Sequence, residues 1–172
     1  PYFMTAISIY SMTVPAFVRG LNNLNAILDK AQKFIDTKKL DQIALLEDRL
    51  IADMLPFRRQ VQIACDFAKG GTARLTGIEP PKFEDTETTI EQLKARVTKT
   101  LEYIGTFAQT AFEESAQRNI NLKVRGNEIS LDGYSYATCM VLPNFYFHLT
   151  IAYGLLRKNG VEIGKQDFIG QL

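Results

Sequence analysis

The sequence predicts an all-α protein, a four-helix bundle with a small β-hairpin between the third and fourth helices. Four segments carry apolar residues at spacings of three and four, the pattern of a helix that buries one face. Residues 120–131 instead alternate apolar and polar side chains, as a pair of half-buried strands does. The 172 residues, 46% of them hydrophobic, favour one domain, residues 4–172. Residues 1–3 precede Met4 and are expected to be an expression remnant.

The first two helices are predicted from their apolar seams, the rows of apolar residues at spacings of three and four that lie along one face of a helix. Helix one is expected from about Tyr10 or Val14 to about Thr37, and helix two from Pro56 to near Gly77. Proline suits the start of helix two because the N–H groups of the first turn have no acceptor within the helix, so the N–H that proline lacks costs no hydrogen bond. The seam of helix one is Phe17, Leu21, Leu24, Leu28, Ala31 and Ile35, and that of helix two is Phe57, Val61, Ala64, Ala68 and Leu75.

Helix three and the hairpin follow a break at Glu79-Pro80-Pro81, where proline excludes helix. Thr88 and Glu91 have the spacing of a capping box, which predicts the start of helix three. The alternating segment is expected to turn at Gly126-Asn127. A lone hairpin is marginal in water, so it should pack on the helices.

Helix four is predicted from Pro143 to the cap at Asn159-Gly160. Residues 134–141 are expected to form a further helical approach to it. Because the residue before a proline disfavours the helical conformation, the two parts are not expected to make one unbroken helix.

Composition narrows the classes of function. Twenty Lys and Arg stand against nineteen Asp and Glu, and the signs are interspersed, which argues against nucleic-acid binding. The absence of a run of about eighteen apolar residues and of a leader pattern predicts a cytoplasmic protein that does not enter a membrane. The two cysteines, Cys65 and Cys139, form no paired motif and are expected to be reduced.

His148, the one histidine of the chain, is the first candidate for chemistry. In helix four it shares a face with Phe145, Ala152 and Leu155, so it should point inward. Asn144 lies one turn earlier and could fix the imidazole tautomer through a hydrogen bond. The other interpretation is a core histidine with a purely structural role.

Helix two supplies two further candidates, Gln62 and Asp66, which stand one turn apart. Asp66 is surrounded in sequence by apolar residues, so its carboxylate needs an arginine, a metal or a histidine as partner. The structural alternative is an ion pair with Arg59 or another basic side chain at the bundle edge. There is no phosphate-binding glycine loop, and no Ser-His-Asp or CxxC arrangement.

Three stretches of the sequence, PFRRQVQIACDFAKG, PPKFEDTE and LPNFYFHLTIAYGLLRKNGVEIGKQDFIG, resemble a branch of uncharacterised proteins within the DinB/YfiT-like metalloenzyme superfamily. The resemblance implies an up-down four-helix bundle, often a homodimer, in which three histidines hold a divalent metal such as zinc or nickel. At the matching positions this chain has His148, Asn144 and, within a few residues, Gln62. One imidazole and two amides make a weak transition-metal site, which Asp66 could strengthen.

Three hypotheses about function follow. The leading one is a protein that binds a small molecule or partner in a degenerate metal cleft lined by Gln62, Asp66, Asn144 and His148. The second is a divalent-metal-dependent hydrolase or thiol transferase with the metal held by His148 and Asp66. The third is a dimeric interaction module that associates through helices one and two and holds no ligand.

Overall fold

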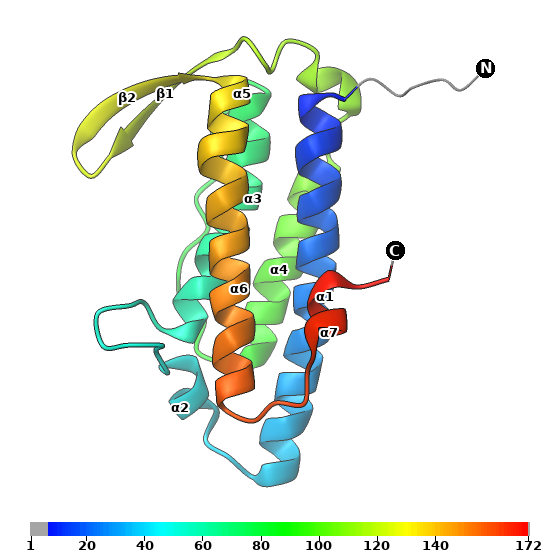
Figure 1. The fold of residues 1–172 in the computed structure, drawn as a ribbon, viewed down its shortest axis with the longest axis vertical. Coiled ribbons are helices and arrows are strands. Elements are labelled where there is room, and N and C mark those ends of the chain that lie inside the picture. Colours follow the sequence, from blue (N-terminus) through cyan, green and yellow to red (C-terminus); the bar gives the residue numbers. More distant parts are fainter. Residues whose placement is uncertain (1–6, 172) are drawn as a thin grey trace.

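The computed structural model describes residues 7–171, so the expectation about residues 1–3 lies outside the described residues. Four long helices form the body of the molecule: α1 (Ile9–Lys38), α3 (Phe57–Leu75), α4 (Ile90–Gly105) and α6 (Leu142–Lys158) (Figure 1). A two-stranded hairpin, β1 (Asn119–Val124) and β2 (Asn127–Asp132), stands between α4 and α6. The predicted all-α class, the four-helix bundle and the position of the hairpin are confirmed.

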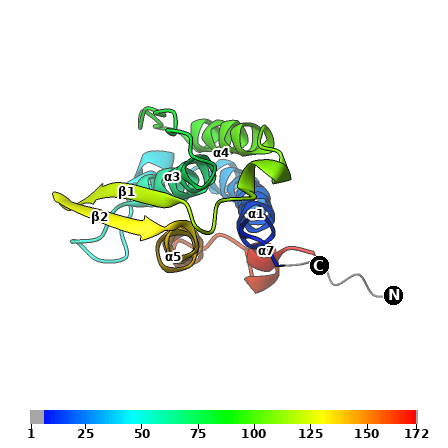
Figure 2. The same cartoon turned by 90° about the horizontal axis from the view of Figure 1, so that it is seen from above.

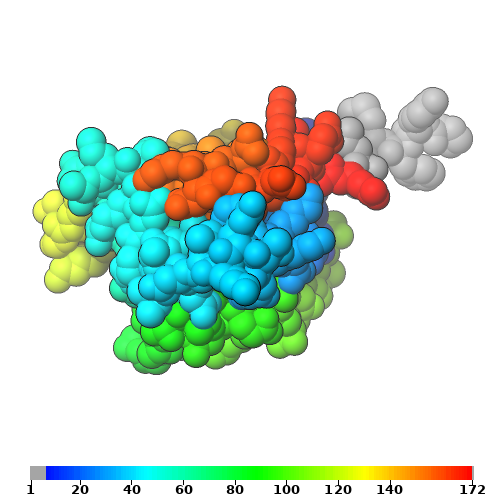
Figure 3. All heavy atoms as spheres, turned by 90° about the horizontal axis from the view of Figure 1, so that it is seen from below, coloured from blue at the N-terminus to red at the C-terminus, as the bar shows by residue number. Residues whose placement is uncertain are grey.

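The four helices sit at the corners of the bundle. Helices α1 and α3 each pack against both α4 and α6, and the view from above places α1 and α3 across from one another (Figure 2). Helices α1 and α6 run in one direction and α3 and α4 in the other, because residues 76–89 return along the bundle before α4 begins (Figure 1). Figure 3 shows the molecule from below, at the end where α1 finishes and α3 begins. There the cyan segment between these helices, which includes α2 (Gln42–Leu46), covers the space between α6 and α4.

Three short elements were not predicted: α2 (Gln42–Leu46), the 3-10 turn η1 (Gln109–Phe112) and α7 (Lys165–Ile169). Each is one turn long or little more, so none repeats its apolar residues often enough for a period to show. The start of α4 differs from the expected one by a residue. Thr89, not Thr88, is the N-cap, and its hydroxyl accepts from the N–H of Gln92 at 3.1 Å.

The hairpin turns at Arg125-Gly126, one residue before the expected position. Both residues have positive φ, 49° and 86°, as the two central residues of a type I′ turn require. The strands pair in register from Asn119 with Asp132 to Val124 with Asn127. Ile120 is buried, so the base of the hairpin packs on the helices while its tip extends away from the bundle (Figure 1).

The approach to α6 is continuous with it, which corrects the expectation of a break at Pro143. The turn α5 (Gly133–Ser135) and the π-helical segment η2 (Tyr136–Val141) run directly into α6. In a standard α-helix the proline ring clashes with the carbonyl one turn earlier. A π segment widens the backbone just before Pro143, and this accommodates the ring without ending the helix.

The continuous helix Gly133–Lys158 is long and apolar enough, by length and composition alone, to cross a membrane. No such segment was predicted from the sequence. The core helix of a folded bundle can have the same length and composition. Here Phe145, Leu149 and Ala152 of α6 are buried in the common core.

Glycines allow the helices to approach closely. A Cβ on Gly71 of α3 would lie 2.5 Å from Cγ1 of Val141, and one on Gly20 of α1 would lie 2.9 Å from the ring of Phe145. Of the Gly70-Gly71 pair, Gly71 therefore permits the close approach of another segment, whereas a Cβ on Gly70 would meet Arg74 of the same helix. Both glycines carry the usual cost in helix propensity. No residue of α3, from Phe57 to Leu75, is exposed, so α3 is covered by other parts of the chain along its whole length.

Candidate functional site

The imidazole of His148 lies half-buried between α6 and α3. Its Nδ1 is 2.7 Å from Oε1 of Gln60, a buried side chain in the first turns of α3. The amide nitrogen of Gln60 donates to the carbonyl of Leu55 at 2.9 Å, so its oxygen is left as the acceptor. His148 therefore carries its proton on Nδ1 and donates it to Gln60.

The pKa of His148 is lowered from its ordinary 6.5, first because burial disfavours the charged ring and second because Arg59 brings a positive charge near it. At pH 7 the ring is thus neutral. Within residues 7–171 no group bonds Nε2, whose lone pair is left to accept a hydrogen bond.

Two aromatic rings fix the plane of the imidazole. Phe67 of α3 stacks on it with ring centroids 6.1 Å apart and planes 14° apart. Phe147, its neighbour on α6, meets it edge to face at 5.1 Å and is half exposed. His148 therefore presents an oriented acceptor beside an exposed aromatic side chain.

Asn144 does not fix the tautomer, in contrast to the expectation. Its amide nitrogen donates 2.7 Å to the carbonyl of Met140 on its own helix. Met140 belongs to the π-helical segment, where the wider turn alters the usual pattern of carbonyl acceptors. The amide that holds His148 comes instead from another helix.

Asp66 bonds a side chain of α4 and Gln62 bonds one of the returning segment 76–89, and neither bonds His148. Asp66 pairs with Arg96 at 2.9 Å and with Lys69 at 3.1 Å. Gln62 accepts from Arg59 at 2.7 Å and donates to Glu87 at 2.7 Å. Asp66 is thus an ion-pair partner of basic side chains, as the structural alternative expected. Its partners are Arg96 and Lys69, whereas Arg59 pairs with Asp85.

Arg96 is the centre of this network. Its side chain is 1% exposed and pairs with Asp66, Asp85 and Glu87 at 2.9 to 3.0 Å. Asp85 and Glu87 belong to the returning segment 76–89, so the network ties this segment to α3 and α4. Three cations, Arg59, Lys69 and Arg96, balance the three carboxylates.

The donor set at His148 does not fit the divalent metal that the family resemblance implies. Gln62 and Asp66 are engaged with Arg59 and Arg96, and Asn144 with its own helix. In the described part of the chain, no three His, Cys, Asp or Glu residues are grouped so as to hold a metal ion. A zinc or nickel site needs three or four such ligands.

The cysteines are predicted to differ in reactivity. Burial raises the pKa of the Cys65 thiol to about 12, whereas Cys139 is exposed. Because the thiolate is the reactive form, one thiol per chain should react promptly with a disulfide reagent in the native protein, and both once urea unfolds it. Two promptly reacting thiols in the native protein would contradict this assignment.

Gln60 is the residue of the candidate site that was not predicted from the sequence. It lies three residues after Phe57 and four before Ala64, on the inward face of helix two. A glutamine on an inward face predicts a polar contact inside the bundle, because a buried amide needs partners for both its oxygen and its nitrogen.

Comparisons with known proteins agree with this architecture. Residues 9–169 match the family described as domain of unknown function (DUF1993). The chain is also similar to the crystal structure of a DinB family member protein from Shewanella denitrificans, with 47% identity over 95% of this chain and 92% of that one, and a TM-score of 0.89. Among curated proteins no significant match is found. The chain therefore belongs to the DUF1993 family, whose fold is DinB-like.

Proposed function

We propose that this chain is a binding protein in which His148 accepts a hydrogen bond from a small molecule at the surface between α3 and α6. The observation that carries the proposal is the 2.7 Å bond between Nδ1 of His148 and Gln60. It fixes the proton on Nδ1 and leaves Nε2 as an oriented acceptor. The ligand therefore presents a hydroxyl or N–H donor.

The surroundings of the ring favour an aromatic ligand. Phe147 is 50% exposed beside the imidazole, and an exposed aromatic side chain next to a directional acceptor suits a planar molecule with a polar edge. Arg59 is engaged with Asp85 and Gln62, so it neutralises charges within the protein rather than offering a free anion site. A neutral phenol-like ligand fits this combination.

The test compares phenol with anisole, its methyl ether, which has the same ring and no donor. As His148 is the one histidine of the chain, its ring signals in a proton-carbon NMR spectrum are assigned without ambiguity in a tag-free protein. Phenol should shift these signals saturably and anisole should not. His148→Phe keeps an aromatic ring but has no acceptor and no imidazole signals, so its binding is followed through the NMR signals of the added compound, and it should bind neither compound.

Equal shifts with phenol and anisole, or saturable binding of phenol to His148→Phe, would overturn the proposal. A second opposing result comes from elemental analysis after incubation with zinc, nickel or manganese. Near-stoichiometric metal that is lost in His148→Ala would replace binding with the metal-dependent hydrolase or thiol transferase hypothesis.

The third hypothesis is a dimer that forms through helices one and two, which are α1 and α3 of the structure. No residue of α3 from Phe57 to Leu75 is exposed, so this helix offers little surface to a second copy. A dimer interface needs about 800 Å² from each partner. The homodimer stays a prediction, and sedimentation equilibrium of the tag-free protein measures it directly.

A further inference from the structure

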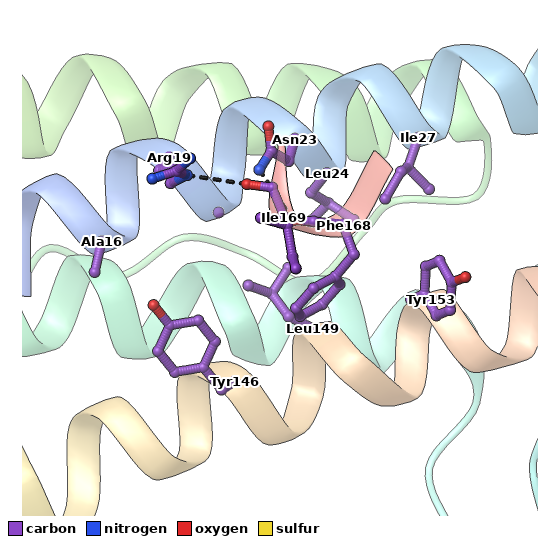
Figure 4. Close-up of a pocket in the computed structure, with 11 residues that line it drawn as sticks. Ala16, Arg19, Asn23, Leu24, Ile27, Tyr146, Leu149, Tyr153, Phe168 and Ile169 are labelled. Atoms are coloured by element: carbon purple, nitrogen blue, oxygen red, sulfur yellow. Dashed lines mark hydrogen bonds between the residues drawn. The ribbon is translucent and has the colours of Figure 1, made fainter. Parts of the chain in front are cut away.

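A cavity of about 240 Å³ lies between α1, α6 and α7, and neither Gln60 nor His148 lines it. Its walls are apolar and come from all three helices: Leu24 and Ile27 of α1, Leu149 of α6 and Phe168 of α7 (Figure 4). An apolar cavity of about 150 Å³ holds benzene. This one has room for a benzene ring with a short side chain.

The helix α7 closes the cavity through a small set of polar contacts. Arg19 donates to the carbonyls of Ile169 and Gln171, and Asn23 donates to that of Phe168 at 3.0 Å. Lys30 pairs with Asp167 at 2.7 Å. Gly170 has φ of +74°, and a Cβ there would meet Asn23 at 2.5 Å. These contacts hold Phe168 over the space between α1 and α6.

Two polar side chains of the cavity lie toward one end, and the hydroxyl of Tyr153 lies toward the other (Figure 4). In Figure 4 Arg19 of α1 and Tyr146 of α6 lie toward the same end of the view, while Ile27 and Tyr153 lie toward the other. No Asp or Glu lines the cavity. Arg19 forms no ion pair with a carboxylate within residues 7–171. A guanidinium has five N–H donors, and the two carbonyls that Arg19 binds are neutral.

We propose that this cavity binds a small apolar carboxylic acid, with the carboxylate at Arg19 and Tyr146 and the tail among Leu24, Ile27 and Leu149. A positive charge at one end of a cavity without acidic residues is complementary to a carboxylate, and charge-assisted bonds to arginine are among the stronger ones. The tail gains by leaving water for an apolar wall. The site is separate from the one at His148 and does not depend on it.

Titration calorimetry with phenylacetate and its neutral isostere phenylacetamide tests the proposal. Phenylacetate should bind the wild-type protein at least about tenfold more tightly than the amide. Arg19→Gln should weaken the acid about tenfold, whereas Lys33→Gln, which removes the same charge from an exposed position on α1, should leave it unchanged. Ala16→Phe, which fills the cavity, should abolish binding of both.

Two further variants separate this site from other effects. Asn23→Ala removes a contact that holds α7 but keeps Arg19, so it should retain the preference for the acid. His148→Ala should bind phenylacetate as the wild type does, whatever happens at the phenol site. Equal affinity for acid and amide, unchanged binding in Ala16→Phe, or no binding by the wild type at up to about 10 mM would each overturn the proposal.

Discussion

Replacing Arg96 by methionine is expected to lower the free energy of unfolding by about 3 kcal/mol. The guanidinium is buried and pairs with Asp66, Asp85 and Glu87. Methionine keeps much of the volume but leaves three carboxylates facing one another without their shared cation. Breaking one partner out of a buried network costs about 3 to 5 kcal/mol. The lower end applies because Asp66 and Asp85 are each 37% exposed.

Urea denaturation followed by circular dichroism measures this effect, with Arg58→Met as the matched control. Arg58 pairs with Glu47 at the surface, where the two side chains are 30% and 47% exposed. Such a pair contributes about 0 to 1 kcal/mol, so the control should stay close to the wild type. Similar losses for the two variants would show that the buried Arg96 network stabilises the fold no more than a surface ion pair does.

Gly133→Ala is expected to lower the free energy of unfolding by about 3 kcal/mol or more. A Cβ on Gly133 would lie 1.7 Å from the backbone oxygen of Ser115. That oxygen cannot move aside freely, because the hydroxyl of buried Ser115 donates to the carbonyl of Leu75 at 2.5 Å and the N–H of Tyr134 donates to Ala116. One methyl group therefore forces the segment before the hairpin away from the helix that follows it.

The matched control lies in the same continuous helix. A Cβ on Gly154 would meet nothing within 4 Å, so Gly154→Ala should raise the free energy of unfolding by about 0.5 to 1 kcal/mol through better helix propensity. Thermal unfolding of the two variants should thus move in opposite directions. A stable Gly133→Ala protein with unchanged melting temperature would contradict the close approach at Ser115.

The four long helices and the hairpin could be predicted from the sequence because each depends on a periodic pattern of apolar residues within its own segment. The seams of Phe17 to Ile35 and of Phe57 to Leu75 repeat often enough to set a period, and the alternation between Ile120 and Leu131 gives the hairpin. The single-turn elements and the continuity of the helix through Pro143 could not be read in this way. They depend on tertiary packing and on a π segment, for which no local pattern exists.

The site was harder to predict than the fold. A three-and-four spacing places His148 on an inward face, yet it does not say which helix supplies the partner. Asn144 was the nearest amide in sequence, whereas the amide that bonds His148 is that of Gln60. The apolar neighbours of Asp66 predicted that its carboxylate has a partner. They did not predict that this partner is Arg96, because the pairing depends on how the parallel helices α3 and α4 pack with the returning segment 76–89.

The most direct test of the account is the protonation state of His148, measured by two-bond proton-nitrogen NMR of the ring during a pH titration of the tag-free protein. The predicted result is a proton on Nδ1 in the neutral ring and a pKa below 6.5, so that the neutral form contributes stability above about pH 6.5 and loses it as the pH falls through the folded-state pKa. Gln60→Leu should abolish the preference for Nδ1. A ring protonated on Nε2, or a pKa above 6.5, would contradict the oriented neutral acceptor on which the proposed binding site rests.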